Sequence, residues 1–118
     1  MRIGTSPNKA ATTDYRPARV TACVLVSVPN QDGYYAQRFD VVRLCLASLL
    51  ANTPPGACDL LVFDNGSCPE VVDWLVSLRA AGRIDYLVLS SRNIGKVNAY
   101  RMMFQQAPGE VVRSEEHT

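Results

Sequence analysis

The chain has 118 residues, of which 47% are hydrophobic and 19% are charged, and its formal net charge is +1. This size and composition predict one soluble globular domain and exclude both a disordered chain and a protein with two independent cores. The even charge balance gives no electrostatic reason to expect nucleic acid as a partner. Because no apolar run reaches the roughly 18 residues that a membrane-spanning helix needs, we also expect no membrane segment in this chain.

Short apolar segments alternate with amphipathic ones along most of the chain. Residues 1–19 lack apolar periodicity and are expected to form a flexible N-terminal arm. The hydrophobic patterns that follow predict strands over residues 20–28, 59–64, 84–89 and from 110 onward, and helices over about 37–51, 69–81 and 96–106. This order predicts an α/β fold: a Rossmann-like parallel sheet of strand order 3-2-1, with a partial fourth strand beside the first.

The last six residues change character abruptly. The apolar run ends at Val112 and is followed by Arg-Ser-Glu-Glu-His-Thr, a stretch that matches the translation of a widely used sequencing adapter. We therefore expect residues 20–112 to form the domain and residues 113–118 to be a non-native tail, with a genuine polar C-terminus as the alternative. His117, the only histidine, lies in this tail and is not a catalytic candidate.

Several common functional motifs are absent. The four cysteines have neither zinc-knuckle nor CxxC spacing, so we expect free thiols in a reducing compartment; they are Cys23, Cys45, Cys58 and Cys68. No G-x-G-x-x-G sequence follows the first predicted strand, and no P-loop sequence is present. A Ser/His/Asp arrangement is excluded with the single histidine in the tail.

Polar segments follow three of the predicted strands, at the edge where ligands bind to open α/β sheets. Asp64 ends the second strand, and its carboxylate can accept hydrogen bonds from a base or a ribose. Gly95 and Lys96 begin a helix, where backbone N–H groups and an ammonium can hold phosphate oxygens. These residue types indicate a nucleotide ligand, while a turn aspartate and a solvated lysine are the alternatives. We expect Asp64 to lie exposed at this edge, near Asn30 and residues 93–96.

These segments, in this order, resemble the N-terminal half of an inverting GT-A glycosyltransferase of family 2. The resemblance covers residues 20–112, and each segment matches one feature of the family: a first strand running into proline, a helix with a Ser-Leu-Leu end, an Asp-Asn-Gly-Ser turn, an Asn-x-Gly-Lys loop and a Gly-Glu strand start. The corresponding segments are Val24–Asn30, Ala47–Thr53, Phe63–Ser67, Asn93–Lys96 and Pro108–Val112.

The resemblance implies a nucleotide-sugar donor, a UDP- or dTDP-sugar, and a glycan or other acceptor. It implies that Asp64 recognises the base, that Pro29 and Asn30 form one wall of the nucleotide pocket, and that the opposite wall is formed by Asn93, Gly95 and Lys96. Asn65 also belongs to the predicted site, where many family members carry a second aspartate. The family further implies a cytoplasmic location, with the inner face of the membrane as the place where a membrane-associated parent enzyme would work.

The same resemblance implies that catalytic groups are missing from this chain. In the family, an Asp-x-Asp motif that binds Mg²⁺ or Mn²⁺ comes a few residues after the position of Val112, and a general-base Asp or Glu comes later. A metal of this kind assists departure of the nucleoside diphosphate, and the base deprotonates the acceptor hydroxyl. We therefore expect an N-terminal fragment of a glycosyltransferase that is inactive by itself.

Two alternatives belong to other functional classes. A sugar-phosphate nucleotidyltransferase would carry a basic, glycine-rich loop after the first strand, whereas here no lysine or arginine occurs between Pro29 and Arg38. A non-catalytic doubly wound regulatory domain of the receiver type would need an acceptor aspartate after the third strand, and that strand ends in Leu89-Ser90 instead. Both alternatives therefore fit the sequence less well than the glycosyltransferase half.

Overall fold

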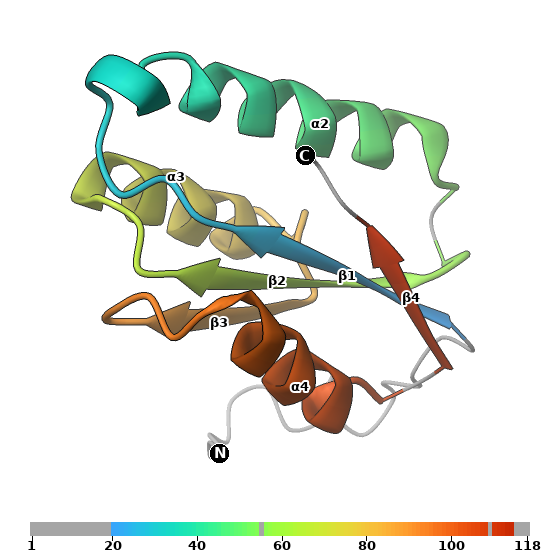
Figure 1. Cartoon of the computed structure of the whole chain (residues 1–118). Helices are drawn as coiled ribbons and strands as arrows, with labels where there is room; N and C mark the ends of the chain where they lie inside the picture. The colour runs from blue at the N-terminus through green and yellow to red at the C-terminus, as the bar shows by residue number, and fades with distance from the viewer. Residues whose placement is uncertain (1–19, 55, 109, 115–118) are drawn as a thin grey trace.

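The computed structural model describes residues 20–54, 56–108 and 110–114; the predicted arm and Glu115–Thr118 of the predicted tail lie outside the described residues. Four parallel strands form one open sheet in the order β3-β2-β1-β4 (Figure 1). The strands are β1 (Val20–Val26), β2 (Asp59–Asn65), β3 (Tyr86–Ser90) and β4 (Glu110–Ser114). The predicted α/β class with a parallel sheet is confirmed.

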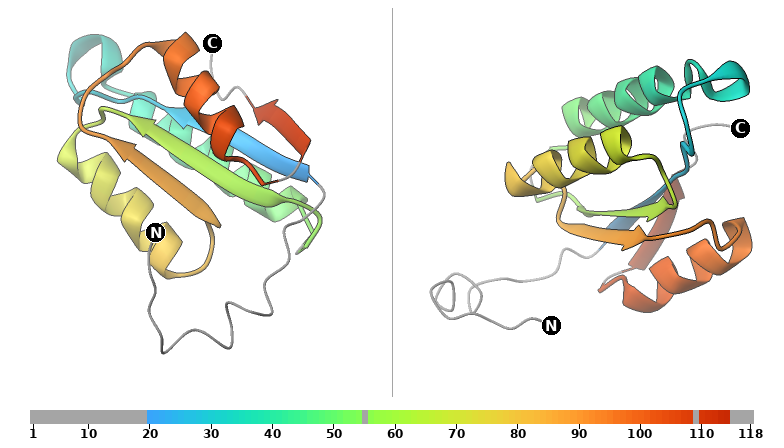
Figure 2. Two further views of the ribbon diagram at one scale, coloured as in Figure 1. Left: turned by 90° about the horizontal axis from the view of Figure 1, so that it is seen from below. Right: turned by 90° about the vertical axis from the view of Figure 1, so that its left-hand side faces the viewer.

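Three α-helices connect the strands, and a short 3-10 helix, η2 (Gly33–Tyr35), precedes the first of them. Helices α2 (Arg38–Asn52) and α3 (Pro69–Ala80) cover one face of the sheet, and α4 (Lys96–Gln106) covers the other (Figure 2). Two successive crossovers run from β1 outward to β3, and the third returns past β1 to β4. Because crossovers between parallel strands are right-handed, this reversal places α4 on the opposite face.

Several strand ends differ from the sequence-based prediction: β2 ends at Asn65 and not at residue 64, and β3 covers Tyr86–Ser90 and not residues 84–89. The first strand was expected to continue to Val28, but β1 ends at Val26, and the chain then turns toward η2. The fourth strand was expected to end at Val112, but β4 continues through Arg113 and Ser114, which pair with Cys23 and Val24 of β1. The ladder is made by backbone groups, so polar residue types do not end a strand that still has a neighbour to pair with.

Alternating residues of β1 and β2 pack in two separate apolar layers, one on each face of the sheet. Val24 of β1 and Val62 of β2 pack against α2 and α3, where Leu46 and Leu75 are buried. The intervening strand residues face α4 in a second buried cluster, formed by Cys23, Leu25, Leu61 and Phe63 with Ala99, Tyr100 and Met103. Both central strands are thus buried on both faces, as their near-continuous apolar sequences predicted.

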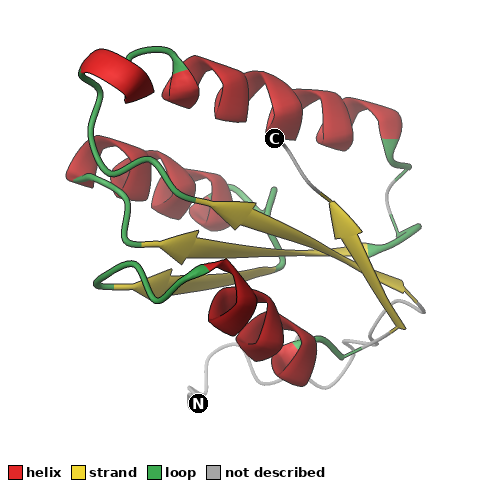
Figure 3. Ribbon diagram, viewed as in Figure 1, coloured by secondary structure: helices red, strands yellow, loops and turns green. Residues whose placement is uncertain are grey.

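The loops that follow β1, β2 and β3 gather at one edge of the sheet (Figure 3). The chain order reverses at β1, since β2 lies on one side of it and β4 on the other. In open α/β sheets, the crevice outside the carboxyl ends of the strands at such a reversal is where ligands bind. The topology therefore places the loops that carry the predicted site residues at the edge where a ligand is expected to bind.

Candidate functional site at the carboxyl edge of the sheet

The predicted site residues divide into an exposed group and a buried group. Those from the loops after β1 and β3 are exposed, namely Pro29, Asn30, Asn93, Gly95 and Lys96. The two at the end of β2 are buried: Asp64 is 0% exposed and Asn65 is 3% exposed. The expectation that Asp64 lies exposed at the edge is therefore wrong.

Asp64 is buried because helices cover both faces of β2, and strand alternation decides which of the two layers it enters. Its side chain follows the parity of Leu60 and Val62, both of which belong to the apolar layer under α2 and α3. One carboxylate oxygen, Oδ2, accepts a hydrogen bond from the Ser67 backbone N–H at 3.0 Å. The other oxygen, Oδ1, is buried and has no hydrogen-bond partner among the described residues. Burial raises the pKa of Asp64, while hydrogen bonds from the side chain and backbone of Ser67 lower it.

Ser67 connects the loop after β2 to the start of the loop after β1. Its Oγ accepts a hydrogen bond from the Val28 N–H at 2.9 Å, and the Cys68 N–H donates to the Val28 carbonyl at 2.9 Å. The Ser27 hydroxyl also donates to the Asn65 carbonyl at 3.4 Å. Ser67 was not among the predicted site residues, although the Asp-x-x-Ser spacing at the end of a strand is typical of a turn closed by side chains.

Asn65 connects the same loop to the loop after β3. Its Oδ1 accepts a hydrogen bond from the Ile94 N–H at 2.9 Å, and its Nδ2 donates to Asn93 Oδ1 at 3.2 Å. Asn93 Oδ1 also accepts from the Gly95 N–H at 2.8 Å. The structure thus brings Asn65, Asn93 and Gly95 together, as members of one hydrogen-bonded cluster.

Gly66 lies in close contact with the loop after β3. A Cβ atom added to Gly66 would lie 2.6 Å from the backbone N of Asn93 and 2.7 Å from the carbonyl carbon of Arg92. The residue also has a φ of +78°, which side-chain-bearing residues rarely adopt. Only glycine therefore allows the two loops to approach this closely.

The loop after β1 is less closely tied to this cluster. Asn30 Oδ1 accepts a hydrogen bond from the Asp32 N–H at 2.9 Å, which stabilises the turn into η2. Among the described residues, no hydrogen bond joins Pro29 or Asn30 to Asn65 or Asn93. Next to this turn, the Tyr34 side chain is 83% exposed, and the Arg38 guanidinium carbon lies 6.0 Å from its ring centroid.

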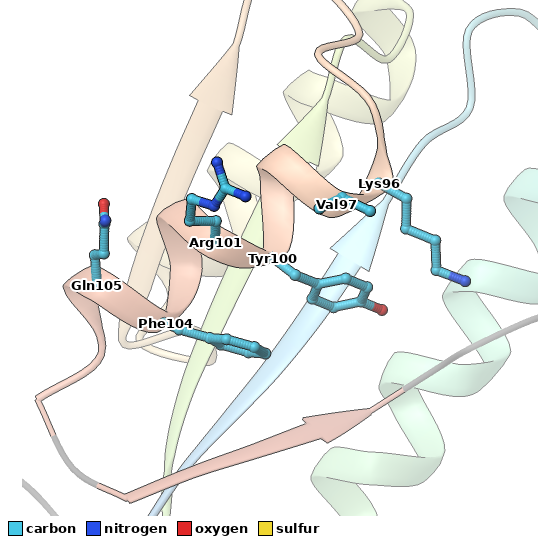
Figure 4. Close-up of a pocket in the computed structure, with 6 residues that line it drawn as sticks. All are labelled: Lys96, Val97, Tyr100, Arg101, Phe104 and Gln105. Carbon is cyan, nitrogen blue, oxygen red and sulfur yellow. The ribbon is translucent and has the colours of Figure 1, made fainter.

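A separate hollow of about 580 Å³ lies along α4 (Figure 4). It is lined by Lys96, Val97, Tyr100, Arg101, Phe104 and Gln105. The Tyr100 and Phe104 rings stack with centroids 5.8 Å apart, and Val97 and Phe104 are exposed. Of the predicted site residues only Lys96 reaches this hollow, so it is distinct from the polar cluster at the end of β2.

Acidic and thiol side chains do not form a metal site in the part of the chain that the structure describes. No three His, Cys, Asp or Glu residues lie close enough together there to hold an ion. These residues therefore do not fit the divalent metal that the family resemblance implies for a whole enzyme.

In the same described ranges, no helix is long and apolar enough to cross a membrane.

Comparison of the chain with protein-family models, curated proteins and solved structures gave no match.

Proposed function

We propose that this chain is the nucleotide-binding part of an inverting glycosyltransferase that takes its sugar from a UDP- or dTDP-sugar. The observation that carries the proposal is the joining of the loops after β2 and β3 by Asn65, at the carboxyl edge of a parallel sheet. The order of the family-like segments along the chain adds to it. The proposal includes a glycan or similar acceptor and a cytoplasmic location, at the inner face of the membrane for a membrane-associated parent.

In this proposal the exposed residues contact the nucleotide, and the buried ones position them. Pro29 and Asn30 form one wall of the pocket, while Asn93 and Gly95 form the opposite wall. The Lys96 ammonium, at the first residue of α4, attracts the diphosphate together with the positive end of the helix dipole. Because these are all binding interactions, the proposal for this chain comprises donor recognition alone and includes no metal-dependent step.

Asp64 takes a different part from the one that the family resemblance implies. A fully buried carboxylate that accepts the Ser67 N–H is placed to hold the turn after β2. Ser67 in turn accepts a hydrogen bond from the N–H of Val28, the residue before Pro29. The Asp64 carboxylate therefore holds, through Ser67, the backbone that leads into Pro29 and Asn30. We therefore propose that Asp64 supports nucleotide binding by positioning these loops.

The proposal is tested by calorimetric titration of the chain with UDP, dTDP, ATP and pyrophosphate. We expect UDP or dTDP to bind at least about tenfold more tightly than ATP, a difference of roughly 1.4 kcal/mol. Replacement Lys96→Met should weaken diphosphate binding, whereas Arg83→Met, which removes an exposed cation at the opposite edge, should leave it unchanged. Equal affinity for all four ligands, or no binding, would contradict the proposal.

Hydrolysis of a nucleotide-sugar donor in the presence of Mn²⁺ should stay at the background rate. Metal-dependent turnover would contradict the restriction of this chain to donor recognition.

A further inference from the structure

The orientation of the Asn93 carboxamide is fixed by a backbone donor. Asn93 Oδ1 lies 2.8 Å from the Gly95 backbone nitrogen. A backbone N–H can only donate, so the atom that faces it has to be the carboxamide oxygen and not the nitrogen. The Asn65 amide nitrogen donates to this same oxygen at 3.2 Å, which adds a second constraint in the same sense.

A backbone donor also fixes the orientation of the Asn65 carboxamide. Its Oδ1 accepts the Ile94 backbone N–H at 2.9 Å, so its nitrogen necessarily occupies the other end of the carboxamide, toward Asn93. The side chain is 3% exposed, which leaves it no space to rotate without losing both hydrogen bonds. The backbone of Gly66 packs against the Asn93 nitrogen and limits movement of the loop as a whole. The buried amide of Asn65 therefore sets the direction of the exposed amide of Asn93.

The consequence is that Asn93 offers only donors to its surroundings. Its oxygen already accepts two hydrogen bonds, whereas its NH₂ group has no partner among the described residues, and the residue is exposed. We infer that Asn93 is a specificity-determining residue that donates hydrogen bonds to an acceptor oxygen of the bound nucleotide, either a pyrimidine carbonyl or a phosphate oxygen. This inference rests on the proposed function. The Asn93 amide would disfavour a ligand that places an amino group next to it, because two hydrogen-bond donors would then face each other.

The direct test is the replacement Asn93→Asp. The aspartate keeps an oxygen for Gly95 and Asn65 but has no N–H to donate. Ser91→Asp, on an exposed residue of the same loop, adds the same charge without touching the cluster and serves as the matched control. We expect Asn93→Asp to weaken UDP binding at least about tenfold, and Ser91→Asp to weaken it less than about threefold, since exposed charges are screened. Equal effects of the two variants would overturn the inference.

Two smaller probes distinguish the sources of the acceptor oxygen. If Asn93→Asp weakens binding of uridine, the oxygen belongs to the base; if it weakens binding of pyrophosphate only, the oxygen belongs to the phosphates. Failure of the wild-type chain to bind UDP, uridine and pyrophosphate would refute the proposed function, and the nucleotide contact of Asn93 with it. UDP binding by wild type that is retained in Asn93→Asp would refute the inference alone.

A measurement without ligand tests the geometry itself. In the free chain, the NH₂ protons of Asn93 should exchange rapidly with water in nuclear magnetic resonance spectra, and those of Asn65 should be protected. Asn65→Ala keeps the hydrogen bond from the Gly95 N–H but removes the one from Asn65, so the Asn93 side chain should become more mobile and its chemical shifts partly averaged. Retained dispersion of the other signals would report an intact fold. Protected Asn93 protons would show that the amide is already engaged and would overturn the inference.

Discussion

The two edges of the sheet are built in different ways. At the carboxyl edge, loops that are far apart in sequence are joined through polar side chains, with Ser67 bonded to Val28 and Asn65 to Ile94. At the opposite edge, the turn after α3 is closed by its own backbone: the Gly82 N–H donates to the Arg79 carbonyl, and the Arg83 N–H donates to the Leu78 carbonyl. There the Asp85 carboxylate ties this connection to the start of β2 and not to another loop.

The glycines show the same contrast. Gly66 and Gly82 have the same φ of +78°, so both turns require a left-handed residue. A Cβ atom on Gly66 would meet the backbone of a distant loop, while a Cβ on Gly82 would have nothing within 4 Å. At the carboxyl edge, loops that are distant in sequence therefore lie in close contact, whereas a Cβ atom at Gly82 would meet no other loop. Close contacts between loops are expected where several loops together form a binding site.

The largest expected effect comes from Gly66→Ala. The alanine would adopt a strained φ, at a cost of about 1–2 kcal/mol, and its Cβ would also push against the Asn93 backbone, at a further cost of about 1–3 kcal/mol. Gly82→Ala, with the same φ and free space, should bear only the first cost. Chemical denaturation of both variants measures the difference. Equal losses of stability would show that the approach of the two loops contributes nothing beyond the turn conformation.

The second expected effect concerns a pair of asparagines. Asn65→Ala leaves the Ile94 N–H without its side-chain acceptor, removes one of the two donors to the Asn93 oxygen, and should lower the free energy of unfolding by about 1–3 kcal/mol. Asn52, exposed near the opposite edge, donates to the Ser48 carbonyl at 2.8 Å within α2, and Asn52→Ala should change stability by less than about 0.5 kcal/mol. A larger loss in Asn52→Ala would contradict the claim that polar side chains stabilise the carboxyl edge more than the other edge.

The smallest expected effect is a pH dependence from Asp64. Burial raises its pKa in the folded chain above the ordinary value of 3.8. As the pH rises from 3.8, the unfolded chain loses this proton first, so the wild type loses stability until the pH exceeds the raised pKa of the folded state. Asp64→Asn cannot ionise, so its stability relative to wild type should improve over that interval.

Denaturation of Asp64→Asn and wild type across a series of pH values above 3.8 measures this difference. Asp85→Asn provides the comparison at the opposite edge, because the exposed Asp85 carboxylate also accepts a backbone N–H, that of Leu60, at 2.7 Å. A stability difference between Asp64→Asn and wild type that does not change with pH would show that the carboxylate is not penalised by burial.

The burial of Asp64 shows where position at a strand end was a misleading guide. Asp64 was expected to be exposed because it ends a strand at the edge where ligands bind to open α/β sheets. In the alternation of β2, Asp64 has the parity of Leu60 and Val62, and it therefore lies on the face that α2 and α3 cover. Parity decides only which face Asp64 lies on; it is buried because helices cover both faces of β2, so that all seven residues of the strand are buried.

The sequence by itself determined which segments form the α-helices and strands and the order of the strands in the sheet, but not the exact strand ends or the short helix η2. Apolar runs, helical spacing and glycine or proline stops are local properties, and right-handed crossovers leave few ways to connect three βα units. Only the tertiary structure decided which polar residues of the carboxyl edge touch one another. Asn65 and Asn93 are separated by 28 positions along the chain, and their hydrogen bond depends on ångström-scale distances between loops. Such distances follow from the packing of the helices on both faces of the sheet, which no local pattern of residues encodes.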